Sequence, residues 1–237
     1  MKADRHEPQF NTYANGQALA EALSADIAAA LQAAIARDGA AVLAVSGGAT
    51  PRNMFQALSR TAIDWSKVTV TLVDERFVPP SHERSNHRLV ATHLLQNEAA
   101  FASFIPLYCE GLSPQEAANG AASKIEALKK PIDIAVLGLG TDGHTASWFP
   151  GSPELAAVTD PEQEKTVMAI EAPDIPEPRL TLTQPVLRGV QTVVLHIEGQ
   201  EKRDVFEAAL APGPVAALPV RAILRETKRP LQVTWAP

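Results

Sequence analysis

Residues 132–147 read IDIAVLGLGTDGHTAS, and this stretch indicates both the fold of the chain and a candidate site. Residues 132–137 form a mainly apolar run, which is typical of a strand covered on both faces of a parallel sheet. The strand ends in glycines, and Asp142, Gly143 and His144 follow. A buried strand that leads through glycines into Asp-Gly-His predicts an imidazole exposed on a loop.

Short apolar runs of the same kind recur along the chain and alternate with helical patterns. Further strands are predicted at residues 40–45, 68–73 and 191–197, with a closing strand at 231–235. The alternation predicts an α/β fold with a mainly parallel sheet and helices on both faces. The helix signals are apolar spacing from Leu19 to Ile35 with Gly39 as a stop, Pro51 at a first helical position, Ser85 as the cap of residues 85–95, a capping box at 113–116, and a pattern at about 200–210.

The composition is that of an ordinary soluble globular protein, with 46% hydrophobic and 20% charged residues in a chain of 237. We expect one domain over residues 1–237.

The formal net charge of -6 argues against a nucleic-acid partner. The first residues lack the apolar core of a signal peptide, and no uninterrupted apolar run is long enough to span a bilayer, so we expect a cytoplasmic protein without membrane contact. Cys109 is the only cysteine, which excludes an internal disulfide.

A glycine loop, SGGATP at residues 46–51, closes the first of these strands and opens a helix. Backbone N–H groups and the positive end of the helix dipole would face an anion there, and the glycines permit its close approach. The glycine spacing is neither that of the dinucleotide fingerprint nor that of the P-loop. A tight turn that binds nothing remains the alternative for this loop taken alone.

Asp74, Glu75 and Arg76 follow the second strand, at the rim where an open parallel sheet binds its ligand. Because adjacent residues of an extended segment point to opposite sides, Asp74 and Arg76 are expected to share a face while Glu75 points away. A surface ion pair is the structural alternative.

Among the six histidines, His144 is the strongest catalytic candidate because it follows a glycine-rich strand end with Asp142 beside it. Imidazole titrates near neutral pH and is therefore able to take a proton from water and return it, and Asp142 is placed to restrain its tautomer. The other five histidines are expected to be hydrated surface residues. No His-x-x-x-His or Glu-x-x-His pattern occurs, so no metal site is expected. Lys202 and Arg179 are candidate cations for an anionic substrate.

Together and in this order, the motifs resemble those of the 6-phosphogluconolactonase family, whose superfamily also contains glucosamine-6-phosphate deaminase. The matching pieces are residues 46–51, 74–79, 85–87, 138–150 and 179–183. The resemblance implies a Rossmann-like three-layer sandwich of the deaminase type. It also implies hydrolysis of 6-phospho-D-glucono-1,5-lactone to 6-phospho-D-gluconate in the oxidative pentose phosphate pathway, with no required cofactor. We expect a small-molecule partner and a monomer or small homo-oligomer.

The resemblance also assigns residue roles. His144 would be the catalytic histidine, with Asp74 and Arg76 as active-site partners. His144 would deprotonate a water for attack on C1, while Arg76 and nearby N–H groups stabilise the oxyanion. Asp74 would orient either the sugar or the histidine. The residues implied in substrate and phosphate binding are Ser46, Gly47, Gly48, Thr50, Asn86, Asp142, Arg179 and Lys202.

Two other functions are weighed against lactone hydrolysis. The deaminase pattern continues after Asp-Gly-His with a glutamate that supports ring opening, whereas residues 145–150 (TASWFP) contain no carboxylate. A non-enzymatic sugar-phosphate sensor would use the same pocket for binding alone. Sensors of this kind in transcriptional regulators carry a DNA-binding segment, and this acidic chain reaches its first predicted helix within about 16 residues.

Overall fold

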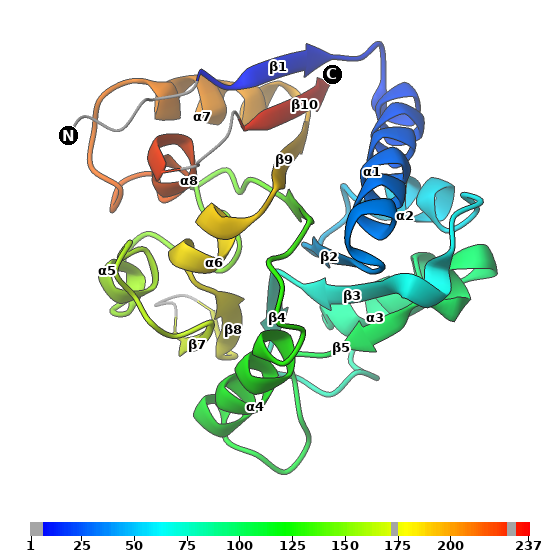
Figure 1. The fold of residues 1–237 in the computed structure, drawn as a ribbon. Coiled ribbons are helices and arrows are strands. Elements are labelled where there is room, and N and C mark those ends of the chain that lie inside the picture. The colour runs from blue at the N-terminus through cyan, green and yellow to red at the C-terminus, as the bar shows by residue number, and fades with distance from the viewer. Residues whose placement is uncertain (1–6, 172–174, 227–230) are drawn as a thin grey trace.

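The computed structural model describes residues 7–171, 175–226 and 231–237 (Figure 1). Its larger sheet has seven strands, every neighbouring pair parallel, in the order β1-β10-β9-β6-β2-β3-β5. The strands are β1 (Gln9–Thr12), β2 (Ala41–Val45), β3 (Val68–Leu72), β5 (Ser103–Ile105), β6 (Ile134–Leu137), β9 (Thr192–Glu198) and β10 (Gln232–Ala236). All five predicted strands are therefore confirmed, with ends shifted by one or two residues.

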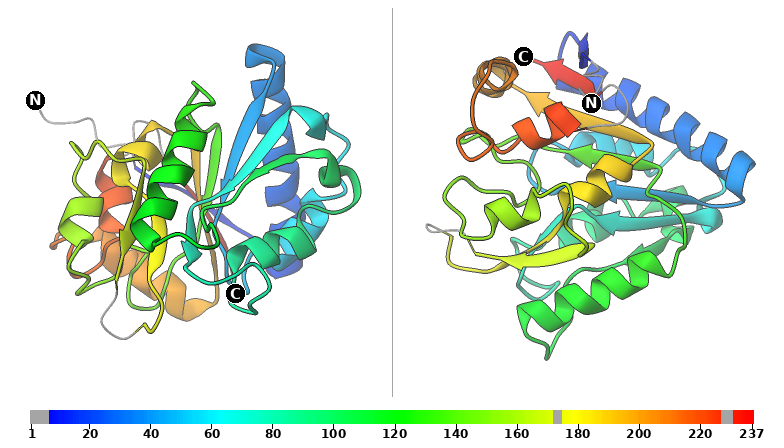
Figure 2. Two further views of the ribbon diagram at one scale, coloured as in Figure 1. Left: turned by 90° about the horizontal axis from the view of Figure 1, so that it is seen from below. Right: turned by 60° about the vertical axis from the view of Figure 1, so that its left-hand side comes forward.

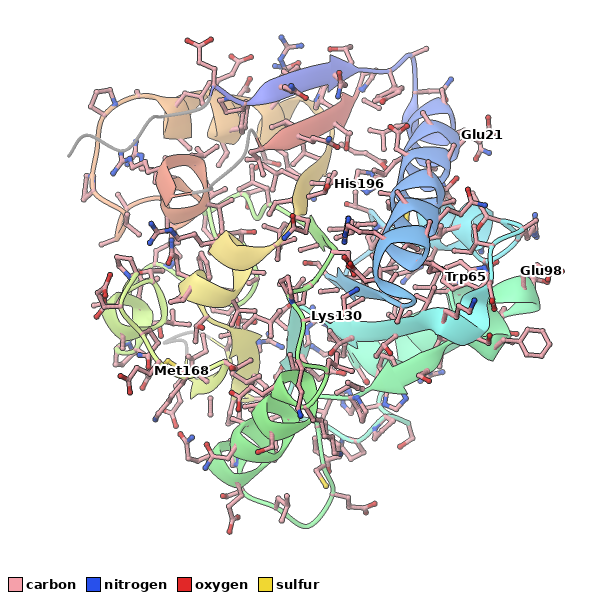
Figure 3. All side chains as sticks on the ribbon, viewed as in Figure 1. Glu21, Trp65, Glu98, Lys130, Met168 and His196 are labelled. Atoms are coloured by element: carbon pink, nitrogen blue, oxygen red, sulfur yellow. The ribbon has the colours of Figure 1, made fainter. Side chains whose placement is uncertain are left out.

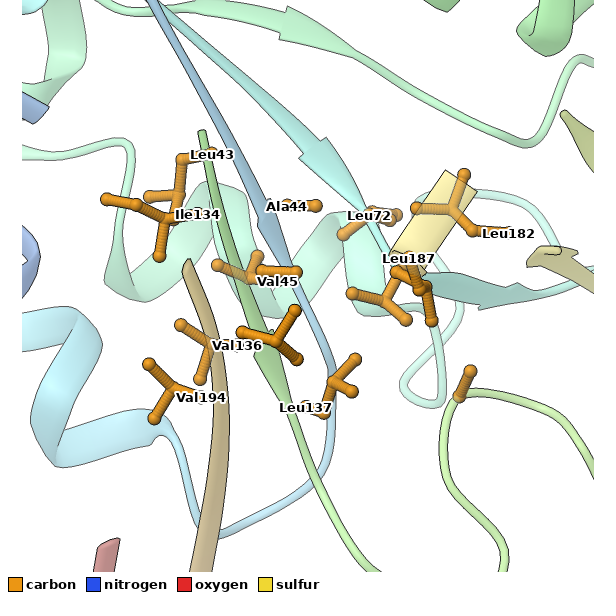
Figure 4. Packing of buried hydrophobic residues seen from close by; sticks show 14 of the residues in the cluster. Leu43, Ala44, Val45, Leu72, Ile134, Val136, Leu137, Leu182, Leu187 and Val194 are labelled. Atoms are coloured by element: carbon orange, nitrogen blue, oxygen red, sulfur yellow. The ribbon is translucent and has the colours of Figure 1, made fainter. Parts of the chain in front are cut away.

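The central strands are apolar because both of their faces are covered. All residues of β2 and β6 are buried. Leu43, Val45, Val136, Leu137 and Val194 lie close together in the core between the sheet and its helices (Figure 4). Burial on both faces removes the alternation of polar and apolar residues that a half-exposed strand would show.

The helix signals in the sequence are also confirmed, in most cases at the predicted caps. Gly39 ends the first helix in the left-handed conformation, with φ 79°, and the Ser85 side chain accepts from the Arg88 amide. Ser113 and Glu116 form the predicted capping box. The helix begins at Arg52, so Pro51 precedes the first helical position instead of occupying it as predicted. The helices are α1 (Gly16–Asp38), α2 (Arg52–Leu58), α3 (Asn86–His93), α4 (Pro114–Glu126), α5 (Leu155–Val158), α6 (Gln184–Gly189), α7 (Gln200–Leu210) and α8 (Arg221–Glu226), with short 3₁₀ turns at Trp65–Lys67 and Asn97–Phe101.

Helices cover both faces of the larger sheet, which gives three layers. In Figure 2, α1 and α2 lie on one side of the strands and α4 on the other. This arrangement confirms the predicted α/β class with a mainly parallel sheet. Helix α1 is long and apolar enough to cross a membrane by length and composition alone. However, Leu19, Leu23, Ile27 and Leu31 of this helix are buried, and α1 contacts α2, β2 and β10 as a core helix does.

A second sheet was not predicted from the sequence. It has three antiparallel strands in the order β4-β8-β7, formed by β4 (Asp74–Arg76), β8 (Arg179–Leu182) and β7 (Val167–Ile170). The interpretation of Asp74–Arg76 as the end of the second parallel strand was wrong, because β3 ends at Leu72 and β4 pairs with β8 instead. The sequence at residues 172–178 (APDIPEP) is rich in proline and indicates a surface loop, of which residues 172–174 lie outside the described part of the chain.

The topology of the larger sheet fixes the place of a ligand site. From β2 the chain continues to β3 and β5 in one direction, whereas from β6 it continues to β9 and β10 in the other. Strands β2 and β6 are neighbours, so the reversal falls between them. In open α/β sheets, ligands bind beyond the carboxyl ends of the strands at such a reversal.

Candidate active site

A cavity of about 280 Å³ opens at the reversal between β2 and β6. Its walls come from the glycine loop after β2, from β4, from the loop after β6, and from β9 and α7. Nine of the predicted site residues line it: Ser46, Gly47, Gly48, Thr50, Asp74, Arg76, Asn86, His144 and Lys202.

The glycine loop needs its glycines for two separate reasons. A Cβ on Gly47 would lie 1.8 Å from Asn86 Oδ1, so only glycine leaves room for the Asn86 amide. Asn86 in turn donates from Nδ2 to the Asp74 carbonyl, 2.8 Å away, and thereby joins α3 to β4 at the cavity. Gly48 has φ 99°, a conformation that side-chain-bearing residues rarely adopt. The loop therefore follows the cavity wall with its backbone exposed to a ligand.

Lys202 approaches the glycine loop from α7. Its Nζ donates to Thr50 Oγ1 at 3.2 Å. Burial lowers the pKa of Lys202, although the charges of Glu198 and Glu201 oppose this effect. A partly desolvated ammonium beside a glycine loop is a suitable partner for a phosphate.

Asp74 and Arg76 both line the cavity, whereas Glu75 does not, as the alternation predicted. Glu75 is fully buried and accepts hydrogen bonds from the backbone N–H groups of Arg76, Asn86 and His87 and from the Ser85 hydroxyl. Burial raises the pKa of Glu75 in spite of these four hydrogen bonds. Its carboxylate therefore ties β4 to the first turn of α3, which carries Asn86.

The Asp74 carboxylate is held by a residue of the histidine loop. Ser147 Oγ donates to Asp74 Oδ2 at 2.5 Å, and both residues are buried. The Ser147 amide donates to Thr181 Oγ1 on β8, 3.3 Å away. One oxygen of Asp74 is thus occupied by the protein, and the second sheet positions the carboxylate against the loop that carries His144.

His144 has a fixed ring orientation. Its Nδ1 lies 2.5 Å from Asp142 Oδ1, and its ring packs on Phe149 with the ring centroids 4.6 Å apart. Because a carboxylate only accepts hydrogen bonds, Nδ1 carries the proton and Nε2 keeps its lone pair in the neutral ring. Gly140 makes this geometry possible, since a Cβ there would lie 2.1 Å from His144 Nδ1. The arrangement leaves a base at Nε2.

Asp142, and not Asp74, is the aspartate that contacts the His144 ring; the sequence left this role open between the two. Desolvation would raise its pKa, but hydrogen bonds from the His144 side chain and backbone, together with the charge of the ring, hold the pKa below its ordinary value. Asp142 itself does not line the cavity. It contacts His144, whereas Asp74 is bonded to Ser147, so Asp74 is free to face the substrate.

Arg179 is the second predicted site residue that does not line the cavity. It is buried on β8, with NH1 2.9 Å from Glu177 Oε1, and its guanidinium lies over the Phe149 ring at 5.9 Å. Burial lowers the pKa of Arg179, and the neighbouring charge of Arg76 adds to this. In this structure Arg179 contacts a ring that supports His144.

His196 was missed by the sequence analysis. The interpretation of the histidines other than His144 as hydrated surface residues was wrong for His196, which is 2% exposed on β9 and lines the cavity. His87 is also partly buried, with its ring 4.6 Å from that of Phe104. His6 lies outside the described residues. The signal for His196 was its place within the apolar run 191–197, where a side chain is covered.

Comparison with known proteins identifies the family of the chain. The family described as glucosamine-6-phosphate isomerases/6-phosphogluconolactonase matches residues 14–235. The chain belongs to this family. A 6-phosphogluconolactonase of Rhizobium meliloti is 52% identical over 237 residues, which cover 100% of both chains.

Solved structures of the glucosamine-6-phosphate isomerase/6-phosphogluconolactonase family share the fold. A 6-phosphogluconolactonase from Shewanella baltica superimposes with a TM-score of 0.94 and 39% identity, covering 98% of each chain. A monomeric glucosamine-6-phosphate deaminase superimposes with a TM-score of 0.79 at 16% identity, covering 96% of this chain and 97% of its own. The second likeness concerns the fold alone, and together the two confirm the predicted sandwich of the deaminase type.

Proposed function

We propose that the protein hydrolyses 6-phospho-D-glucono-1,5-lactone to 6-phospho-D-gluconate, as in the oxidative pentose phosphate pathway. The observation that carries this proposal is the placement of His144 in one cavity with a glycine loop and Lys202. A base and a phosphate site in one cavity match a phosphorylated lactone. The relative from Rhizobium meliloti, similar over its full length, bears the name of this activity.

In this proposal His144 is the general base. Nε2 takes a proton from a water that attacks C1, and the Nδ1–H bond to Asp142 stabilises the imidazolium that forms. Arg76 and nearby backbone N–H groups stabilise the oxyanion. When the tetrahedral intermediate collapses, the imidazolium returns the proton to the departing ring oxygen. Asp74, with one oxygen held by Ser147, orients the sugar.

Phosphate binding is assigned to the glycine loop and Lys202. Gly47 and Gly48 allow the backbone to approach the phosphate closely, and Lys202 with Thr50 adds a charged and a hydroxyl contact. Asn86 packs against Gly47 of this loop from α3. The reaction needs no metal or cofactor in this scheme, because a lactone carbonyl is already electrophilic.

The deaminase activity is the second candidate, since the fold is shared with a glucosamine-6-phosphate deaminase. Residues 145–150 offer no carboxylate for ring opening, and the buried Ser147 hydroxyl is engaged by Asp74. We place the lactonase reaction in the cytoplasm, with the protein as a monomer or small homo-oligomer. The composition supports this placement.

One experiment separates the candidates. A single purified sample is assayed for hydrolysis of 6-phosphogluconolactone above the spontaneous rate and for ammonia release from glucosamine 6-phosphate. We expect the first activity and not the second. Ammonia release with no lactone hydrolysis would assign the cavity to the deaminase, and binding without either reaction would indicate a sensor.

A further inference from the structure

His196 is a buried imidazole in the cavity wall that the proposed reaction does not use. It extends from β9 (Figure 3), is 2% exposed, and lines the cavity together with His144 and Lys202. Buried polar atoms of side chains nearly always have at least one hydrogen-bond partner. The partners of His196 therefore indicate what the side chain does.

One ring nitrogen of His196 has a partner in the protein. Nε2 lies 3.1 Å from Glu198 Oε1. The pKa of Glu198 is lowered, first by this hydrogen bond and then by the charges of His196 and Lys202, against the effect of desolvation. Glu198 is therefore an ionised acceptor at neutral pH, and Nε2 carries the proton that is donated to it. Gly16 lies against the Glu198 carboxylate, since a Cβ on Gly16 would lie 3.0 Å from Glu198 Oε2.

The other ring nitrogen has no partner. His196 Nδ1 is buried and makes no hydrogen bond with any of the described residues, and the same is true of Ser46 Oγ in the same cavity. In the neutral form of the ring, whose single proton is then on Nε2, Nδ1 offers a lone pair to a donor. A buried acceptor without a hydrogen-bond donor raises the free energy of the folded protein, so a bound group that donates to Nδ1 would lower it.

We propose that His196 is a substrate-binding residue that accepts a hydrogen bond from a hydroxyl of the sugar lactone, and that Glu198 positions it. The inference rests on the proposed function and adds a contact for the ring of the substrate. A phosphate dianion has only acceptors and does not satisfy Nδ1, whereas a sugar hydroxyl donates. His196 therefore recognises the polyol and Lys202 the phosphate.

The test uses His196→Phe, which keeps an aromatic ring and removes the acceptor. The matched control is His93→Phe, because His93 lies on α3 and does not line the cavity. Lactone hydrolysis gives kcat and KM, and calorimetry gives the affinity for 6-phosphogluconate and its 2-, 3- and 4-deoxy analogues. Losing the contact should raise KM and weaken 6-phosphogluconate binding about tenfold, with little change in kcat. One deoxy analogue should bind the wild type about tenfold more weakly than its parent, and bind His196→Phe as well as the parent does.

Two results would overturn the proposal. One is unchanged affinity of His196→Phe for 6-phosphogluconate. The other is a loss of affinity in His196→Phe that is equal for 6-phosphogluconate and all three analogues, so that each analogue still binds more weakly than its parent by the same factor as in the wild type. His196 would then be a packing residue. If His196→Phe does not fold, Glu198→Gln is used in its place, because an amide at position 198 no longer fixes the tautomer of the His196 ring. The deoxy analogue that binds the wild type more weakly should then bind Glu198→Gln about as well as 6-phosphogluconate does. A wild type that binds the analogues as expected but does not hydrolyse lactone would reject the proposed function and not the His196 contact.

Discussion

His144 is placed as a base by its immediate neighbours. Asp142 holds Nδ1, Phe149 supports the ring, and the absence of a side chain on Gly140 leaves space for both His144 and Asp142. The sequence predicted the histidine and its aspartate because they are adjacent in the chain. It did not separate the roles of Asp74 and Asp142, because the Ser147 contact that engages Asp74 joins residues 73 positions apart.

Replacing His144 should remove most of the activity. His144→Asn loses the base at Nε2 and is expected to lower kcat about 10²- to 10⁴-fold with the fold intact, because the side chain is partly exposed. Turnover is measured against spontaneous lactone hydrolysis, and circular dichroism checks folding. His93→Asn serves as the control on α3. Near-wild-type turnover of His144→Asn would exclude His144 as the base.

Replacing Lys202 should affect the phosphorylated substrate selectively. Losing one charge-assisted contact is expected to lower kcat/KM for 6-phosphogluconolactone roughly 10- to 150-fold, with a much smaller effect on unphosphorylated gluconolactone. The measurement compares Lys202→Ala with Lys124→Ala, which removes an exposed lysine from α4. An equal slowing of both lactones would mean that Lys202 acts at the carbonyl or in folding.

At the scale of elements, the strands and helices were predictable where each carries its own signal. Buried apolar runs and side-chain caps are local, and β2, β6, α3 and α4 lie where these patterns predicted them. The second sheet was not predicted, because β4 has three largely polar residues and its partner β8 lies about a hundred positions further along the chain. His196 was missed for a related reason, since its environment is created by strand packing.

The contact between the glycine loop and α3 can be tested by replacing each of two glycines with alanine. Gly47→Ala places a methyl group against the Asn86 amide and is expected to destabilise the protein by about 1–3 kcal/mol and to raise KM. Gly120→Ala, in α4 with nothing within 4 Å of the added Cβ, should stabilise it by about 0.5–1 kcal/mol without changing kinetics. Urea unfolding and lactone assays measure both. Equal behaviour of the two variants would contradict the close approach of loop and helix.

Glu75, which joins β4 to α3, should give a specific pH dependence. Its pKa is raised in the folded chain, so the folded state binds this proton at a higher pH than the unfolded state, whose glutamates titrate near about 4.3. The contribution of Glu75 to stability should therefore grow as pH falls from neutral towards that value. The unfolding free energy of the wild type minus that of Glu75→Gln should therefore increase as pH falls from neutral towards about 4.3. If wild type minus variant stayed constant or decreased as pH falls, burial would not dominate the pKa of this carboxyl.

At the scale of the whole molecule, we expect the reaction to need no metal. Within residues 7–171, 175–226 and 231–237, no group of three or more His, Cys, Asp or Glu side chains is arranged to hold a metal ion. We expect kcat and KM to be unchanged after treatment with EDTA, since the proposed base is a histidine and the carbonyl is already activated. The control adds back magnesium or zinc. Activity that is lost on chelation and restored by a divalent ion would contradict the mechanism.

The pairing of β1 with β10 has a consequence for how the protein is made. β1 lies at the edge of the sheet, bonded to β10 from Gln9↔Gln232 to Thr12↔Trp235, and β10 is its one neighbour among the described strands. During synthesis the first strand therefore emerges from the ribosome more than two hundred residues before its partner exists. The five strands from β9 to β5 are able to assemble earlier, so the sheet should be completed only after β10 has been synthesised, when β10 pairs with both β9 and β1.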